Sequence, residues 1–161
     1  MSIITLYLKK NESERNMSEF LQKYSGFLGG VMKWEDLSKL WSTISDQQSS
    51  SWYVYAVGEQ VPVKTATGEQ LHQFIVSIDE LLRKEHDEDY CGIVYVDDIE
   101  NPEFIKIYDP NNLGVVCGYS ENPPLPGWVM SQVQPEDLEL AFPPPASRKR
   151  WWKKIFSWLR F

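Results

Sequence analysis

Long apolar runs are missing from this sequence of 161 residues. No stretch approaches the roughly 18 consecutive apolar residues of a membrane-spanning helix, so we expect no such helix. The opening stretch MSIITLYLKKNESERN has no basic region ahead of its apolar residues and no small-residue cleavage site. We therefore expect no secretory signal peptide and place the protein in the cytoplasm.

Cysteine and histidine are scarce as well. The chain has two cysteines, Cys91 and Cys117, and two histidines, His72 and His86. Without a secretory signal, we expect two reduced thiols rather than a disulfide, and their spacing does not supply the four ligands of a zinc site. The patterns GxxxxGKS/T, GxGxxG and GxSxG are also absent. The sequence therefore predicts neither a metal nor a cofactor.

Aromatic residues, by contrast, are abundant. Seven Trp, eight Tyr and seven Phe make up 14% of the chain, whereas hydrophobic (42%) and charged (24%) residues occur at the levels of ordinary soluble domains. So much aromatic surface favours burial and argues against a disordered chain. A mass of 18.8 kDa allows one domain with a single core, together with a short appendage.

Charge is divided unequally along the chain. Residues 147–161, which we call the tail, contain six Lys or Arg and no acid, whereas the other 146 residues carry a net charge of −13. An acidic body would repel phosphate backbones and anionic lipid, and a cationic tail would be attracted to them. The two parts are therefore expected to have separate roles.

Apolar spacing predicts both strands and helices. Alternating, β-branched and aromatic residues predict strands at 2–8, 52–57, 93–96, 104–108, 115–118 and 128–133. Three-and-four spacing predicts helices at 18–26, 33–48 and 68–86, with a turn or short helix at 135–142. Gly29-Gly30 is interpreted as a flexible joint and residues 61–64 as a short edge segment.

This order of elements predicts the fold class. We expect a single α+β domain over residues 1–142, with an antiparallel or mixed sheet and about three helices on one face. Thr67 should cap the helix that packs Leu71, Phe74, Ile78 and Leu82 on the sheet. Residues 92–108 should form an antiparallel hairpin that turns at 97–102. Pro143, Pro144 and Pro145 then predict an extended spacer ahead of the tail, so that residues 143–161 stand apart from the domain.

The tail carries the most specific functional pattern. On a helix, its large apolar residues cover an arc of about 160° and its cations occupy the other side. Aromatic rings flanked by Lys and Arg are typical of a helix that lies in a membrane interface. The predicted membrane-binding residues are Arg148, Lys149, Arg150, Trp151, Trp152, Lys153, Lys154, Ile155, Phe156, Trp158, Leu159 and Arg160. Docking on the protein's own body or on a partner protein is the first alternative, and nucleic acid is the second.

The stretch RWWKKIFSWLRF, Arg150 to Phe161, resembles the amphipathic membrane-targeting helix of the bacterial actin-like cell-division protein. That helix also combines Trp with Lys and Arg on a short segment after a linker. The resemblance is confined to these residues and implies a mode of attachment rather than kinship. The rest of the chain has no actin-like nucleotide motif and is much too short.

Cys91 and His86 supply an alternative from another class of function. They lie five residues apart across an expected helix-to-strand turn, so they could form the Cys/His pair of a small thiol-dependent hydrolase. The acidic stretch HDEDY around them would raise the pKa of the thiol and weaken it as a nucleophile. A small apolar residue ahead of a strand is also typical of a core position.

The acidic residues suggest two further hypotheses. A hard-metal site could draw on His86, Asp87, Glu88, Asp89, Asp97, Asp98 and Glu100, but their spacing matches no calcium loop and is typical of solvated surface. An acidic nucleic-acid mimic ranks third, since the acids cluster in turns and at helix ends rather than spread over one face.

Taken together, these patterns favour a non-catalytic adaptor or regulatory protein of the bacterial cytoplasm. Its tail would hold it at the anionic surface of the inner membrane, and its acidic body would contact a protein partner that the sequence does not identify. We expect no nucleic acid as partner, and the sequence makes no prediction of oligomeric state.

Overall fold

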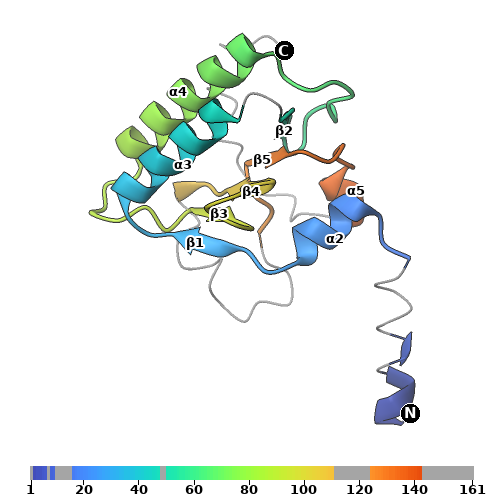
Figure 1. Cartoon of the computed structure of the whole chain (residues 1–161). Coiled ribbons are helices and arrows are strands. Elements are labelled where there is room, and N and C mark those ends of the chain that lie inside the picture. Colours follow the sequence, from blue (N-terminus) through green and yellow to red (C-terminus); the bar gives the residue numbers. More distant parts are fainter. Residues whose placement is uncertain (1, 7, 10–15, 48–49, 111–123, 143–161) are drawn as a thin grey trace.

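A five-stranded antiparallel sheet organises the domain (Figure 1). The computed structural model describes residues 2–6, 8–9, 16–47, 50–110 and 124–142. The helices are α2 (Glu19–Ser25), α3 (Trp34–Asp46), α4 (Gly68–Glu85) and α5 (Leu138–Ala141). The strands are β1 (Gly29–Val31), β2 (Tyr53–Ala56), β3 (Val94–Val96), β4 (Phe104–Ile107) and β5 (Trp128–Ser131), in the spatial order β1-β3-β4-β5-β2. The predicted α+β class is confirmed.

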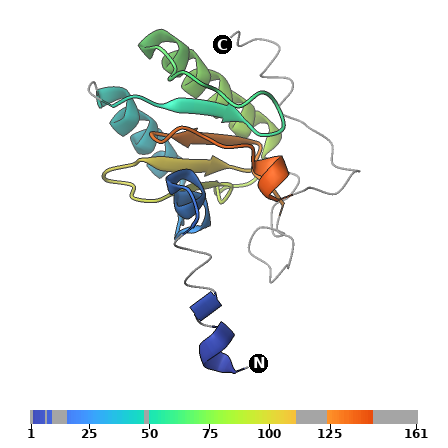
Figure 2. The ribbon, with the colours of Figure 1, turned by 90° about the vertical axis from the view of Figure 1, so that its right-hand side faces the viewer.

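Strand alternation divides the core between the two faces of the sheet. Ile105, Ile107 and Met130 point to one face, where they join the buried residues of α3 and α4. Phe104 and Val129 point to the other face and pack with residues of α2 and α5. Figure 2 shows the long helices behind the sheet and α2 in front of it. The long helices therefore share one face, as expected, whereas α2 covers the opposite one.

Helix α4 follows its prediction closely. The Thr67 hydroxyl accepts a bond from the Gln70 backbone N–H, and the Gln70 side chain accepts one from the Thr67 N–H, which completes a capping box. Phe74, Ile78 and Leu82 are fully buried, and Leu71 is partly buried against the same core. The predicted helical phase is thus correct.

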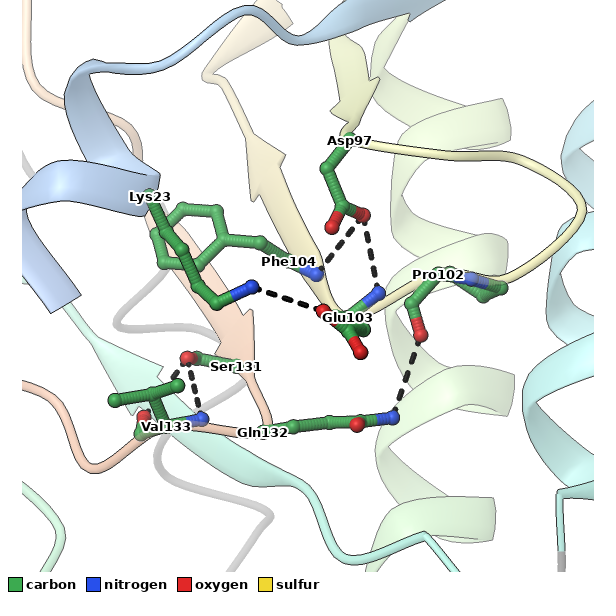
Figure 3. Close-up of polar contacts among 8 residues, drawn as sticks. All are labelled: Lys23, Asp97, Pro102, Glu103, Phe104, Ser131, Gln132 and Val133. Carbon is green, nitrogen blue, oxygen red and sulfur yellow. Dashed lines mark hydrogen bonds and ion pairs between the residues drawn. The ribbon is translucent and has the colours of Figure 1, made fainter. Parts of the chain in front are cut away.

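The hairpin of β3 and β4 is antiparallel, as predicted, with Val94 opposite Ile107 and Val96 opposite Ile105. Asp97 closes its loop, because one carboxylate oxygen accepts the backbone N–H groups of Glu103 (3.0 Å) and Phe104 (3.1 Å). Figure 3 shows this double acceptor beside the Lys23–Glu103 ion pair (2.9 Å), which joins α2 to the start of β4.

The strand predicted at 2–8 is wrong. Residues 3–6 and 8–9 are helical, and the Leu6 N–H donates to the Ser2 carbonyl over 3.1 Å. β-branched residues favour a strand only where a neighbouring strand can pair with them. Among the described residues, no strand of the sheet pairs with this segment.

Two short predictions between the elements are also wrong. Gly29 and Gly30 form part of the edge strand β1 rather than a joint, with Gly30 opposite Tyr95 of β3. A Cβ on Gly30 would lie 3.4 Å from the Tyr95 ring, so glycine leaves room for that ring. Residues 61–64 are not a strand, because this segment runs past β2 without pairing along it. The predicted strand at 115–118 and the spacer and tail at 143–161 lie outside the described residues.

Candidate functional site

The predicted membrane-binding residues, Arg148 to Arg160, all lie outside the part of the chain that the structure describes. The site therefore stays a prediction from sequence. Within the described residues, no helix is long and apolar enough to cross a membrane. Three other places in the described domain combine chemistry with burial, and each is built from different elements.

The first place is Cys91, which lies just ahead of β3. Its backbone N–H donates to the Met32 carbonyl over 2.7 Å, which fixes the chain where it enters the sheet beside β1. The side chain carries a free thiol and is completely buried. Burial raises the pKa of the Cys91 thiol, since a thiolate is poorly solvated in an apolar core. A protonated, inaccessible thiol is a weak nucleophile.

His86 ends α4 and is buried as well, with 5% of its surface exposed. Its imidazole packs near two aromatic rings, with its centroid 5.9 Å from that of Trp34 and 6.0 Å from that of Tyr90. Its buried Nε2 has no hydrogen-bond partner among the described residues. The imidazole is therefore held by ring packing, and no hydrogen bond joins it to the thiol of Cys91 in the described part of the chain. The sequence placed the pair near each other but gave no sign of this aromatic cluster.

The acidic residues suggested as a metal site are dispersed. Asp97 and Asp98 accept backbone N–H groups in the hairpin loop, and residues 87–89 and Glu100 are exposed. In the part of the chain that is described, no three His, Cys, Asp or Glu side chains gather closely enough to hold a metal ion. Asp97 and Asp98 therefore shape the turn.

The second place is a groove along the open edge of the sheet beside β2. It has a volume of about 450 Å³, and its walls come from β2, from residues 60–67, from Gln70 of α4 and from Trp128. Two backbone bonds hold the 60–67 segment near this edge, from Glu59 N–H to the Ala56 carbonyl (3.0 Å) and from Ala66 N–H to the Trp52 carbonyl (2.8 Å). Its lining is mainly apolar, and Lys64 is the charged residue in it.

Lys106 is the third place, on the central strand β4. Its ammonium nitrogen lies 3.7 Å from the centre of the Tyr24 ring, which α2 brings over the sheet. Desolvation by burial lowers the pKa of Lys106 to about 8. The sequence predicts a strand around Lys106 but carries no local signal of the ring that covers the lysine.

Comparison of the chain with protein-family models, with curated proteins and with solved structures gave no match.

Proposed function

We propose that this protein is a non-catalytic adaptor or regulatory module that docks on an anionic membrane surface through residues 147–161. The observation that carries the proposal is the division of charge. A tail of six cations and no acids, rich in Trp and Phe, follows a body with a net charge of −13. An anionic surface attracts the tail and repels the body, so the body is left free to contact a protein partner.

The described residues pack into two buried clusters, one on each face of the sheet, with members between Phe20 and Leu138. Docking of the tail on the body is the main rival, and the experiment below includes it as an outcome.

The thiol-hydrolase alternative receives little support from the geometry. Cys91 is fully buried, burial raises the pKa of its thiol, and the His86 imidazole packs with the rings of Trp34 and Tyr90. A nucleophilic cysteine needs an accessible thiolate with a base in hydrogen-bond reach. A fully buried thiol is better explained as part of the core, to which Cys91 belongs.

Two matched substitutions in the full chain test the membrane proposal. On the tail helix, Ile155 lies near the middle of the apolar arc and Ser157 lies among the cations. Ile155→Glu and Ser157→Glu change the net charge equally, but only the first puts a carboxylate on the apolar side. Sedimentation with phosphatidylcholine vesicles, with and without phosphatidylglycerol, measures binding.

We expect the parent and Ser157→Glu to pellet with anionic vesicles and Ile155→Glu to stay largely in the supernatant. Equal pelleting of the two variants would show that the predicted arc does not contact lipid. If Ile155→Glu instead lowers the thermal stability of the domain while Ser157→Glu does not, the tail packs on the body and the proposal fails.

A further inference from the structure

The backbone of β2 has an open edge at Val54 and Ala56 (Figure 2). The Val57 N–H donates to the Gly127 carbonyl over 3.0 Å, so the odd-numbered residues of β2 exchange hydrogen bonds with β5. Backbone groups alternate along an antiparallel strand, and the N–H and C=O groups of Val54 and Ala56 therefore point away from β5. β2 is last in the spatial order of the sheet, so no other described strand pairs with these groups.

The segment 60–67 crosses this edge without closing it. Its two ends are fixed to β2 by the two backbone bonds described above, and between them no described backbone bond joins residues 60–65 to β2. The N–H and C=O of Val54 and the N–H of Ala56 thus have no backbone partner in the described chain. Both residues are buried nevertheless, with 8% and 4% of their surface exposed. Unpaired backbone groups at buried residues are rare in folded proteins.

The groove beside these groups has mainly apolar walls. Val54, Ala56 and residues 61–63 line it, and so does Trp128, which lies opposite Ala56 on β5. The Trp128 indole N–H is buried and also has no acceptor within the described residues. The groove therefore combines about 450 Å³ of apolar space with unpaired donors and an unpaired acceptor along its β2 side.

These features select an extended peptide as the occupant. Unpaired N–H and C=O groups at a strand edge are matched by the backbone of another extended chain, which adds to the sheet as a further strand. Apolar walls accept the side chains that such a strand directs to one face. Lys64 is the charged residue in the walls, whereas Glu59 and Glu69, which flank the lining residues in sequence, do not line the groove. An acidic side chain beside the apolar ones is therefore favoured.

We propose that the groove beside β2 binds a short, extended, apolar peptide segment of a partner protein, which pairs with the backbone of Val54 and Ala56. At about 3.3 Å per residue, the four residues of β2 offer an edge for a segment of about the same length. This proposal rests on the proposed function only in that the body is taken to contact a protein partner. Docking of the tail on a membrane is not needed for it.

The probe is a peptide selected on the full chain from a random octapeptide library displayed on phage. Fluorescent copies of the selected peptide, each N-methylated at one residue, are compared with the unmodified peptide. N-methylation removes one backbone donor and keeps the side chain. We expect it to weaken binding about ten-fold or more at the positions that face β2, because a buried acceptor loses its donor, and much less at the positions between them.

Two matched substitutions in the full chain locate the site. Val63 lines the groove and is 71% exposed, and Val76 lies on α4 outside the groove and is 51% exposed. Val63→Glu and Val76→Glu change the net charge equally. We expect Val63→Glu to weaken peptide binding at least about five-fold and Val76→Glu less than about two-fold. Hydrogen exchange gives a second measurement, since the peptide should protect the Val54 amide and leave that of Tyr55, which faces β5, unchanged.

Four results would overturn the inference. They are a selection that enriches no peptide, equal losses for Val63→Glu and Val76→Glu, equal effects of N-methylation at every position, and a Val63→Glu variant whose free chain has a lower mass by light scattering. The last result would mean that a second copy occupies the groove. Peptide binding is measured without vesicles, so a chain that binds the peptide but not vesicles supports the groove and overturns the role of the tail. Vesicle binding without peptide binding overturns the inference alone.

Discussion

The Lys106 ammonium nitrogen lies 3.7 Å from the centre of the Tyr24 ring, so a side chain of helix α2 covers a cation on the central strand β4. Within the described residues, no carboxylate forms an ion pair with Lys106. Burial favours the neutral amine and lowers its pKa to about 8, whereas the ring attracts the ammonium form. The two effects oppose each other at this contact.

Lys106→Met should stabilise the protein at neutral pH, by on the order of 1 kcal/mol, because it removes the cost of burying a charge. In the parent, the pKa is about 8 when folded and about 10.5, the ordinary lysine value, when unfolded. The unfolded state therefore binds more protons between these two values, and the contribution of Lys106 to stability rises with pH there. The advantage of Lys106→Met should shrink over that range. Urea unfolding of both proteins at several pH values measures this advantage. A stability difference that stays constant with pH would contradict the lowered pKa of Lys106.

Ile78→Asp should unfold the domain. Ile78 is fully buried on α4, and an unpaired charge there costs several kcal/mol, a large part of the stability of a domain. Val76 lies on the same helix and is 51% exposed, so Val76→Asp is the matched control and should fold. Circular dichroism during thermal melting compares the two variants. Equal melting temperatures would mean that the helical phase of α4 is wrong.

Asp97→Ala should destabilise the domain by about 1–3 kcal/mol, because the backbone N–H groups of Glu103 and Phe104 lose their common acceptor. Glu100 lies exposed in the same loop, so Glu100→Ala should change stability by less than about 0.5 kcal/mol. Denaturant unfolding of both variants measures the difference. An Asp97→Ala variant as stable as the parent would show that the loop closes without this carboxylate.

Cys91 should react slowly with an alkylating agent at neutral pH in the native protein and rapidly in denaturant. The thiol is fully buried and its pKa is raised, so the reagent reaches the sulfur poorly and little of the sulfur is in the reactive thiolate form. Mass-spectrometric mapping of the peptide that contains Cys91 follows the reaction. Rapid native modification would revive the thiol-hydrolase alternative with His86.

The long helices could be predicted because local signals and burial agree in them. In α4, the Thr67 cap and the spacing of Phe74, Ile78 and Leu82 all indicate the same helix and the same buried face. The β3–β4 hairpin was predictable for a similar reason, since its strands alternate and are separated by a polar loop. Where capping signals, apolar spacing and burial all indicate the same element, the sequence alone is enough to predict that element.

The errors come from contacts between residues far apart in sequence. Residues 2–8 have the composition of a strand, but pairing partners decide whether a strand forms. Gly30 was interpreted as part of a joint because the sequence does not show that Tyr95 lies opposite it in the sheet. The environment of Lys106 depends on Tyr24, which is 82 residues away in sequence, so no local pattern indicates it. The groove beside β2 likewise follows from how residues 60–67 are held at the sheet edge.

The most direct test of the membrane account is sedimentation of the full chain and of a chain lacking residues 147–161 with phosphatidylglycerol-containing vesicles. We predict that the full chain pellets with the vesicles. The shortened chain should stay folded, as judged by circular dichroism, and should lose most of its binding. Binding of the full chain should weaken without vanishing as salt rises to physiological levels, where charges are screened over about 8 Å. Equal pelleting of the two chains would contradict the account.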